Sequence, residues 1–226
     1  MLPKVTAVKK MNAKALVHVT ITSDLMCPWC WVGLRKLQEA SKRTNIDASI
    51  DWRPFMLRPN LPDEGVPKSD PTPDSRVGRH LKKAGEEVGI DFTGLTDRTP
   101  NTALFHAVMK HLQDDLKMKP TQVTNFHEAV FEGYFTLGEF PDQAGLLKAA
   151  RRTKGDNTKN LVTALEALFQ ESSTLNGLKH DVHQEALAAS RLGISGVPTF
   201  AFNGQTVFSG AQPVEIFEQM LRKFAQ

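Results

Sequence analysis

The spacing of hydrophobic and polar positions predicts a strand, a helix and a second strand at the start of this 226-residue chain. ALVHVTITS, residues 15 to 23, is rich in β-branched residues and alternates apolar with polar or small side chains, which indicates a strand. A helical stripe follows from residue 28, where Pro28 suits a first helical turn. ASIDWRPF, residues 48 to 55, alternates again. A helical crossover pairs two such strands in parallel, so this region predicts a βαβ unit.

The middle of the chain is helical in pattern. Residues 60 to 75 concentrate prolines and acids and predict a surface connection. From residue 76 to residue 191 the apolar positions recur at helical spacing, without an internal repeat of fixed period. The segments with this pattern are RHLKKAGEEVG, NTALFHAVMKHLQDDLKM (with Leu104, Val108, Leu112 and Leu116 four apart), VTNFHEAVFEGYF, QAGLLKAARR, KNLVTALEALFQ and LKHDVHQEALAASRLG. We expect one helical subdomain.

The last part returns to strands. TFAF and QTVFS flank Asn203 and Gly204, and Asn-Gly is the strongest short hairpin signal because both central positions of a type I′ turn need positive φ. A final helix starts at Pro213, with Phe217 and Leu221 on its apolar face. The whole order is βαβ, a helical insertion, and ββα.

Composition and charge exclude several classes of protein. The 28 basic and 25 acidic residues give a net charge of +3, too weak to predict binding to nucleic acid or an anionic membrane. Residues 1 to 14 carry lysines and no acid but lack the apolar core of a secretory signal, so we expect a flexible leader, with a mitochondrial presequence as the alternative. No stretch is long and apolar enough to span a membrane. Two cysteines do not make a disulfide scaffold, which favours the cytoplasm.

Both cysteines of the chain lie in CPWC, residues 27 to 30. Only a thiolate attacks a disulfide, and a free thiol has a pKa of about 8.5. Cys27 stands at a helix N-terminus, where unpaired N–H groups favour the anion, so its pKa should fall. Cys30 lies one turn on and faces inward, which suits a resolving thiol. Pro28 and Trp29 supply no cation or histidine, so we expect the helix terminus alone to lower the pKa, and we expect these two residues to set the direction of electron flow.

Neighbouring residues offer further chemistry. Asp24 could relay a proton during exchange or could cap the turn before the helix. Trp29 should be exposed beside Cys27 as an apolar surface for substrate, whereas Trp31 should be in the core.

Five pieces of sequence together carry a family resemblance. They are SDLMCPWCWVG, WRPFMLRPNLP, NTALFH, GISGVPTF and SGAQP. Their order and content resemble FrnE-like oxidoreductases of the DsbA family, with 2-hydroxychromene-2-carboxylate isomerases and kappa-class glutathione transferases as more distant kin. The resemblance runs from about residue 17 to residue 221. It implies an α/β thioredoxin fold with a central mixed sheet, its halves at residues 15–60 and 192–226, and a large all-helical insertion at residues 61–191.

The resemblance also implies site residues. In thioredoxin-fold proteins the bond before the equivalent of Pro198 is cis, and Val197 would offer main-chain groups to an extended substrate. Without that context an ordinary trans proline would be expected. Asn101 and His106 match the family's Asn-then-His pattern and would assist substrate binding. The alternative makes Asn101 a helix N-cap and His106 a packed or surface histidine.

The sequence therefore predicts a thiol–disulfide oxidoreductase in which Cys27 attacks and Cys30 resolves. Its partner would be a disulfide-containing protein or a small-molecule thiol, with no tightly bound cofactor and with glutathione as a redox partner or substrate. Direction of exchange and oligomeric state stay open. Three alternatives also stay open: a zinc site joining the cysteines to His106 and His111, a glutathione-dependent isomerase or transferase, and a non-catalytic peptide-binding or chaperone module. We expect no metal.

Overall fold

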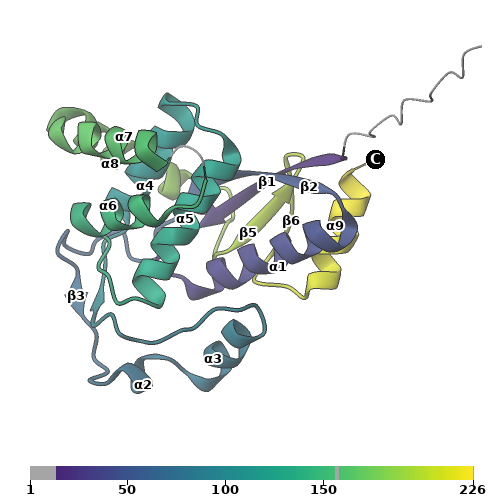
Figure 1. Ribbon diagram of the computed structural model, residues 1–226, viewed down its shortest axis with the longest axis horizontal. Helices are drawn as coiled ribbons and strands as arrows, with labels where there is room; N and C mark the ends of the chain where they lie inside the picture. The colour runs from purple at the N-terminus through teal and green to yellow at the C-terminus, as the bar shows by residue number, and fades with distance from the viewer. Residues whose placement is uncertain (1–13, 156–157, 226) are drawn as a thin grey trace, which may run out of the picture.

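A computed structural model describes residues 14–155 and 158–225, so the predicted leader lies outside the described residues except for Lys14. Figure 1 shows a twisted sheet with the amino- and carboxyl-terminal helices beside it, and a group of insertion helices on its other side in the view. The fold is the predicted α/β thioredoxin fold with a helical insertion.

The sheet has four strands in the order β2-β1-β5-β6. β1 and β2 are parallel, as predicted for a βαβ unit, and β5 pairs antiparallel with β1. The β5–β6 hairpin turns at Asn203 and Gly204, whose φ values of 46° and 81° confirm the expected positive-φ turn. The strand bounds are β1 Leu16–Ser23, β2 Asp47–Pro54, β5 Thr199–Phe202 and β6 Gln205–Ser209.

Two helices pack together against the sheet, α1 (Pro28–Thr44) and α9 (Val214–Phe224). α1 approaches β5 closely at Gly33, where a Cβ atom would lie 3.0 Å from the ring of Phe200. Phe200 in turn packs edge-on against Phe217 of α9, with ring centroids 4.9 Å apart. Burial of these aromatic rings joins the two halves of the thioredoxin domain, which are far apart in sequence.

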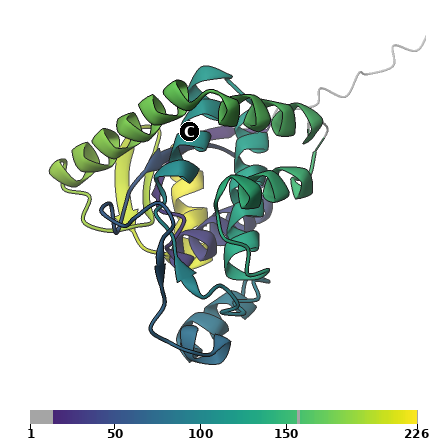
Figure 2. The same cartoon turned by 90° about the vertical axis from the view of Figure 1, so that its left-hand side faces the viewer.

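The insertion carries the remaining elements. Figure 2 shows its first part, from β3 to β4, as a lobe below the rest of the molecule, with the helices α7 and α8 following one another across the top. The bounds are β3 Val66–Pro67, α2 Pro73–Arg76, α3 Arg79–Glu86, β4 Arg98–Thr99, α4 Ala103–Lys110, α5 Pro120–Phe135, α6 Gln143–Arg152, α7 Thr158–Gln170 and α8 Ser172–Arg191.

Two expectations for the insertion need correction. It is not all helical, because β3 and β4 pair as a short antiparallel ribbon, and the presumed surface connection contributes β3 and α2. Residues 101–118 are not one regular helix either. α4 passes into a π-helical turn at His111–Asp115 and ends, which takes Leu116 out of the apolar stripe and leaves it 45% exposed. Within the described residues, no helix has the length and apolar character that a membrane crossing requires.

We predict that Phe200→Ala destabilises the fold by about 3 to 5 kcal/mol, because it removes a fully buried ring and leaves a cavity between α1 and α9. Urea unfolding followed by circular dichroism measures the change. Leu192→Ala is the matched control, since Leu192 is 85% exposed and its truncation should cost less than about 0.5 kcal/mol. Equal effects of the two substitutions would contradict this account of the core.

Candidate active site

Cys27 is the N-cap residue of α1, in extended conformation with φ of −93° and ψ of 107°. A tight turn after β1 brings it there, and the Cys27 N–H donates to the carbonyl oxygen of Asp24 at 3.0 Å. Pro28 occupies the first helical turn as predicted, because its missing N–H costs nothing there. Cys27 is 7% exposed and Cys30, one turn on, is fully buried. Both are free thiols, so the structure represents the reduced protein.

The pKa values of the two thiols move in opposite directions. The pKa of Cys27 is lowered, first by a hydrogen bond from the Cys30 thiol and then by the main-chain N–H groups of Cys30 and Trp29, against the opposing effects of burial and the charge of Asp24. Burial raises the pKa of Cys30 well above its ordinary value, and the neighbouring Cys27 adds to this. The expected direction for Cys27 is confirmed, but the helix terminus is not the only cause. Its partner thiol contributes most.

The loop before β5 lies against Cys27. The Val197–Pro198 peptide bond is cis, as the family resemblance implied. The Cys27 sulfur lies 3.5 Å from the carbonyl oxygen of Val197, to which the thiol donates. Pro198 also touches α1, since its ring would meet a Cβ placed on Gly33 at 3.3 Å. The cysteine pair and the Val197 main chain therefore form one site across 170 residues of sequence.

The burial of the two tryptophans of the motif region, Trp29 and Trp31, nearly matches the prediction. Trp31 is buried and its indole N–H donates to Glu128 at 3.3 Å. Trp29 was expected to be exposed but is half-buried, because its ring packs on His80 of α3 with centroids 5.3 Å apart. The lobe of the insertion thus covers one side of CPWC.

Asp24 is fully buried beside the cysteines. Its carboxylate accepts hydrogen bonds from the main-chain N–H groups of Leu57 at 2.7 Å and Met26 at 3.4 Å, so it does cap the turn. His106 Nε2 lies 3.6 Å from the same carboxylate and has no hydrogen-bond partner among the described residues. The two predicted residues, 82 positions apart, therefore meet in the interior behind Cys27.

Both polar atoms of the Asn101 side chain make hydrogen bonds within the protein. Its amide nitrogen donates to the carbonyl oxygen of Leu61 at 2.6 Å and its carbonyl oxygen accepts from the Ala103 N–H at 2.9 Å. The N-cap of α4 is Thr102, one residue later than the alternative placed it. Asn101 thus ties the segment after β2 to the start of α4, and its part in substrate binding stays a prediction.

Three residues near the site escaped sequence analysis. Ser23 is buried at the end of β1, and its hydroxyl acts to lower the pKa of the Cys30 thiol against the larger, opposite effect of burial. His127 of α5 stacks on Trp52, with centroids 3.8 Å apart, and burial followed by the charge of His106 lowers its pKa well below the ordinary value. Tyr134 donates its hydroxyl to a main-chain carbonyl, and burial followed by the charge of Asp24 raises its pKa. Ser23 opens the SDLMCPWCWVG piece without having been given a role, whereas His127 and Tyr134 belong to no motif, because only the packing of α5 on the sheet brings them there.

The zinc alternative finds no support in the arrangement of ligands. Over the described ranges, no three Cys, His, Asp or Glu side chains come close enough together to hold a metal ion. His111 pairs with Asp115 on its own helical turn, Nδ1 to Oδ2 at 2.9 Å, and does not join the cysteines. His106 faces Asp24 instead.

The sequence matches the family model described as a DSBA-like thioredoxin domain over residues 18–222. It is also 26% identical to the Bacillus subtilis protein YwbO over 212 residues, which cover 91% of this chain and 96% of that protein.

Solved structures are similar over nearly the full length. A probable DsbA oxidoreductase from Streptomyces coelicolor has a TM-score of 0.66 at 23% identity, covering 92% of this chain and 89% of that one. The cytosolic disulfide reductase DsbM from Pseudomonas aeruginosa, solved with GSH, has a TM-score of 0.60 at 17% identity, covering 91% and 98%. At these identities the likenesses establish the fold.

We predict that Cys27 of the reduced protein is alkylated by iodoacetamide at lower pH than a cysteine peptide, because its lowered pKa gives more thiolate at any pH below the ordinary value. Cys30 should resist alkylation until high pH or unfolding. Mass spectrometry of the alkylated peptide across pH 4 to 10 measures both.

Cys30→Ala separates the two causes of the shift. It removes the hydrogen bond that contributes most, so the alkylation midpoint of Cys27 should move upward, while the main-chain N–H groups at the helix start remain. An unchanged midpoint would mean that the helix terminus alone controls the thiolate.

Proposed function

The chain belongs to the family of DSBA-like thioredoxin domains, and from that premise we propose that it is a thiol–disulfide oxidoreductase that works by dithiol–disulfide exchange through Cys27 and Cys30. The observation that carries the proposal is the pairing of unequal thiols: Cys27, at the helix start, has a lowered pKa, and Cys30, buried directly behind it, has a raised one. Cys27 is suited to attack a substrate disulfide, and Cys30 is suited to remain protonated until the mixed disulfide has formed.

The exchange has two displacement steps. The Cys27 thiolate attacks a substrate disulfide, forms a mixed disulfide and releases one substrate thiolate. Cys30 then loses its proton and attacks the Cys27 sulfur, which closes the Cys27–Cys30 disulfide and releases the second thiolate. The substrate gains two electrons and the pair loses two. Two equivalents of an external thiol restore the dithiol, and the same steps in reverse would oxidise a substrate.

The Val197 main chain is suited to holding the substrate. Its carbonyl oxygen faces Cys27 in the reduced protein, at a distance where an extended peptide could replace the thiol as the donor. Main-chain pairing of this kind gives affinity without requiring a particular side chain. We therefore assign Val197 and Pro198 to substrate binding.

Asp24 and His106 are suited to moving the proton of Cys30. A buried thiol cannot pass its proton directly to water, and Asp24 is a buried carboxylate whose main chain contacts Cys30. His106 lies behind the carboxylate with Nε2 unpartnered among the described residues, and it can take up the proton in turn. Positioned acid–base groups of this kind typically contribute a factor of about 10² to 10⁴ to a rate.

Glutathione is the external thiol that we propose as the reductant, in the cytoplasm. The two cysteines of the chain both belong to the exchange site, so none is left for a structural disulfide. A cytosolic glutathione pool is reducing enough to return many dithiol sites to the thiol form.

We predict that Cys30→Ala traps a mixed disulfide on Cys27 with a protein substrate or with glutathione, because no second thiol remains to release it. Non-reducing electrophoresis and intact mass detect the adduct. Cys27→Ser should form none and should lose insulin-reductase activity. Since the chain has no other cysteine, the double variant is a thiol-free control. Full reductase activity in Cys27→Ser would refute the proposed function.

We further predict that Asp24→Asn affects the two steps in opposite senses. The charge of Asp24 raises the pKa of Cys27, so its removal should leave attack as fast or faster at neutral pH. Attack by Cys30 should slow about tenfold or more and should need higher pH, because its proton acceptor is lost. Stopped-flow traces of mixed-disulfide formation and decay separate the steps. Equal slowing of both would indicate a purely structural role for Asp24.

A further inference from the structure

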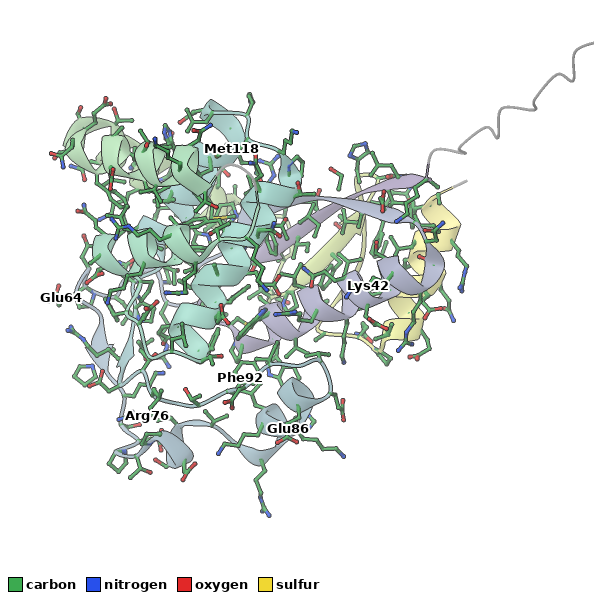
Figure 3. The ribbon with its side chains drawn as sticks, viewed as in Figure 1. Lys42, Glu64, Arg76, Glu86, Phe92 and Met118 are labelled. Atoms are coloured by element: carbon green, nitrogen blue, oxygen red, sulfur yellow. The ribbon has the colours of Figure 1, made fainter. Side chains whose placement is uncertain are left out.

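A cavity of about 180 Å³ opens beside the nucleophile. Met26 and Pro28, the residues on either side of Cys27, form part of its wall. The opposite wall comes from the insertion lobe, with Val77, Leu81 and Phe92 as its apolar part. Phe92, labelled in Figure 3, lies on the side of the lobe that faces α1. The space suits a side chain of several atoms with a flexible apolar stem.

Two cations line the same cavity, and neither has a carboxylate partner among the described residues. Lys68, directly after β3, is half-buried, and its ammonium lies 5.0 Å above the ring of Tyr134. It makes no ion pair within 4 Å. Burial, followed by the charge of Arg76, lowers the pKa of Lys68, and Asp97 opposes this only as the smallest of the three effects. Like charges therefore face one another across a partly desolvated wall.

Arg76, labelled in Figure 3, is positioned by the chain itself. Its guanidinium donates to main-chain carbonyl oxygens, including those of Asp70 at 2.9 Å and Gly94 at 3.1 Å. These contacts fix the group in place and leave its positive charge uncompensated, because carbonyl groups carry no net charge. Arg76 and Lys68 together make the cavity electropositive beside Cys27.

We propose that this cavity is a subsite for a carboxylate of the substrate, close to the disulfide that Cys27 attacks. The inference rests on the proposed function and adds a substrate class to it, acidic disulfides. A carboxylate between Lys68 and Arg76 offsets their repulsion, and the methylene groups that carry it pack on Leu81 and Phe92. Two sources supply this chemistry: an acidic side chain beside a cysteine of a protein, or the carboxylates of a small disulfide such as glutathione disulfide.

The test compares two matched substrate pairs. One pair is a disulfide-linked peptide with Glu or with Gln beside the reactive cysteine, and the other is glutathione disulfide or its methyl ester. The wild-type protein should prefer the carboxylate member by about five- to tenfold in kcat/KM, expressed mainly in KM, since a charge-assisted contact at a partly exposed site is screened. A preference in the peptide pair identifies acidic proteins as the source, and one in the glutathione pair identifies the small disulfide.

Lys68→Met should reduce that preference to within twofold of unity, and Lys68→Arg should retain it. Lys148→Met, at an exposed lysine of α6, makes the same change in net charge and should leave the preference intact.

Raising ionic strength should weaken the preference of the wild-type protein, a measurement that needs no variant. Equal rates within both pairs for the wild-type protein, or a preference that persists in Lys68→Met, would overturn the inference. The thiol tests of Cys27 and Cys30 would be unaffected by that result.

Discussion

The placement of two thiols one helical turn apart at the start of α1 is the constraint on which the active site depends. It exists because α1 starts at Pro28, which sets Cys27 at the helix entrance and Cys30 one turn further inside. A single geometry then produces two opposite effects: the neighbouring Cys30 thiol lowers the pKa of Cys27, while burial, with Cys27 beside it, raises the pKa of Cys30. The asymmetry between attacking and resolving residues is therefore a property of the pair and of its place at the end of β1.

The rest of the fold holds that pair in place. β1 delivers it, β5 brings the Val197 carbonyl oxygen against Cys27, and the aromatic contact of Phe200 with α9 fixes β5 to α1. The insertion contributes on two sides. α4 places His106 behind Asp24, and the lobe from β3 to β4 covers Trp29 and forms the electropositive cavity. The thioredoxin core supplies the chemistry, and the insertion supplies the surroundings that can select a substrate.

Local patterns predicted much of this structure. The two parallel strands, the helix beginning at Pro28 and the Asn203–Gly204 hairpin each depend on residues close in sequence, and each was found where expected. Leu116 shows where local patterns fail, because a π-helical turn adds a residue to the period and ends the stripe. The half-burial of Trp29 was missed for another reason: its cover, His80, belongs to an element 50 residues away.

By itself, the sequence determined the nature of the reaction centre. CPWC after a strand specifies two thiols at a helix start. The order of the five sequence pieces, of which CPWC is part of the first, specifies the family. The tertiary structure alone decided how the pKa of Cys27 is lowered, that His106 contacts Asp24, and that Lys68 and Arg76 line a cavity beside the nucleophile. The physical reason is distance along the chain. Helix position and turn type follow from neighbouring residues, whereas burial, charge pairing and cavity shape arise from segments that meet only when the insertion closes over the sheet.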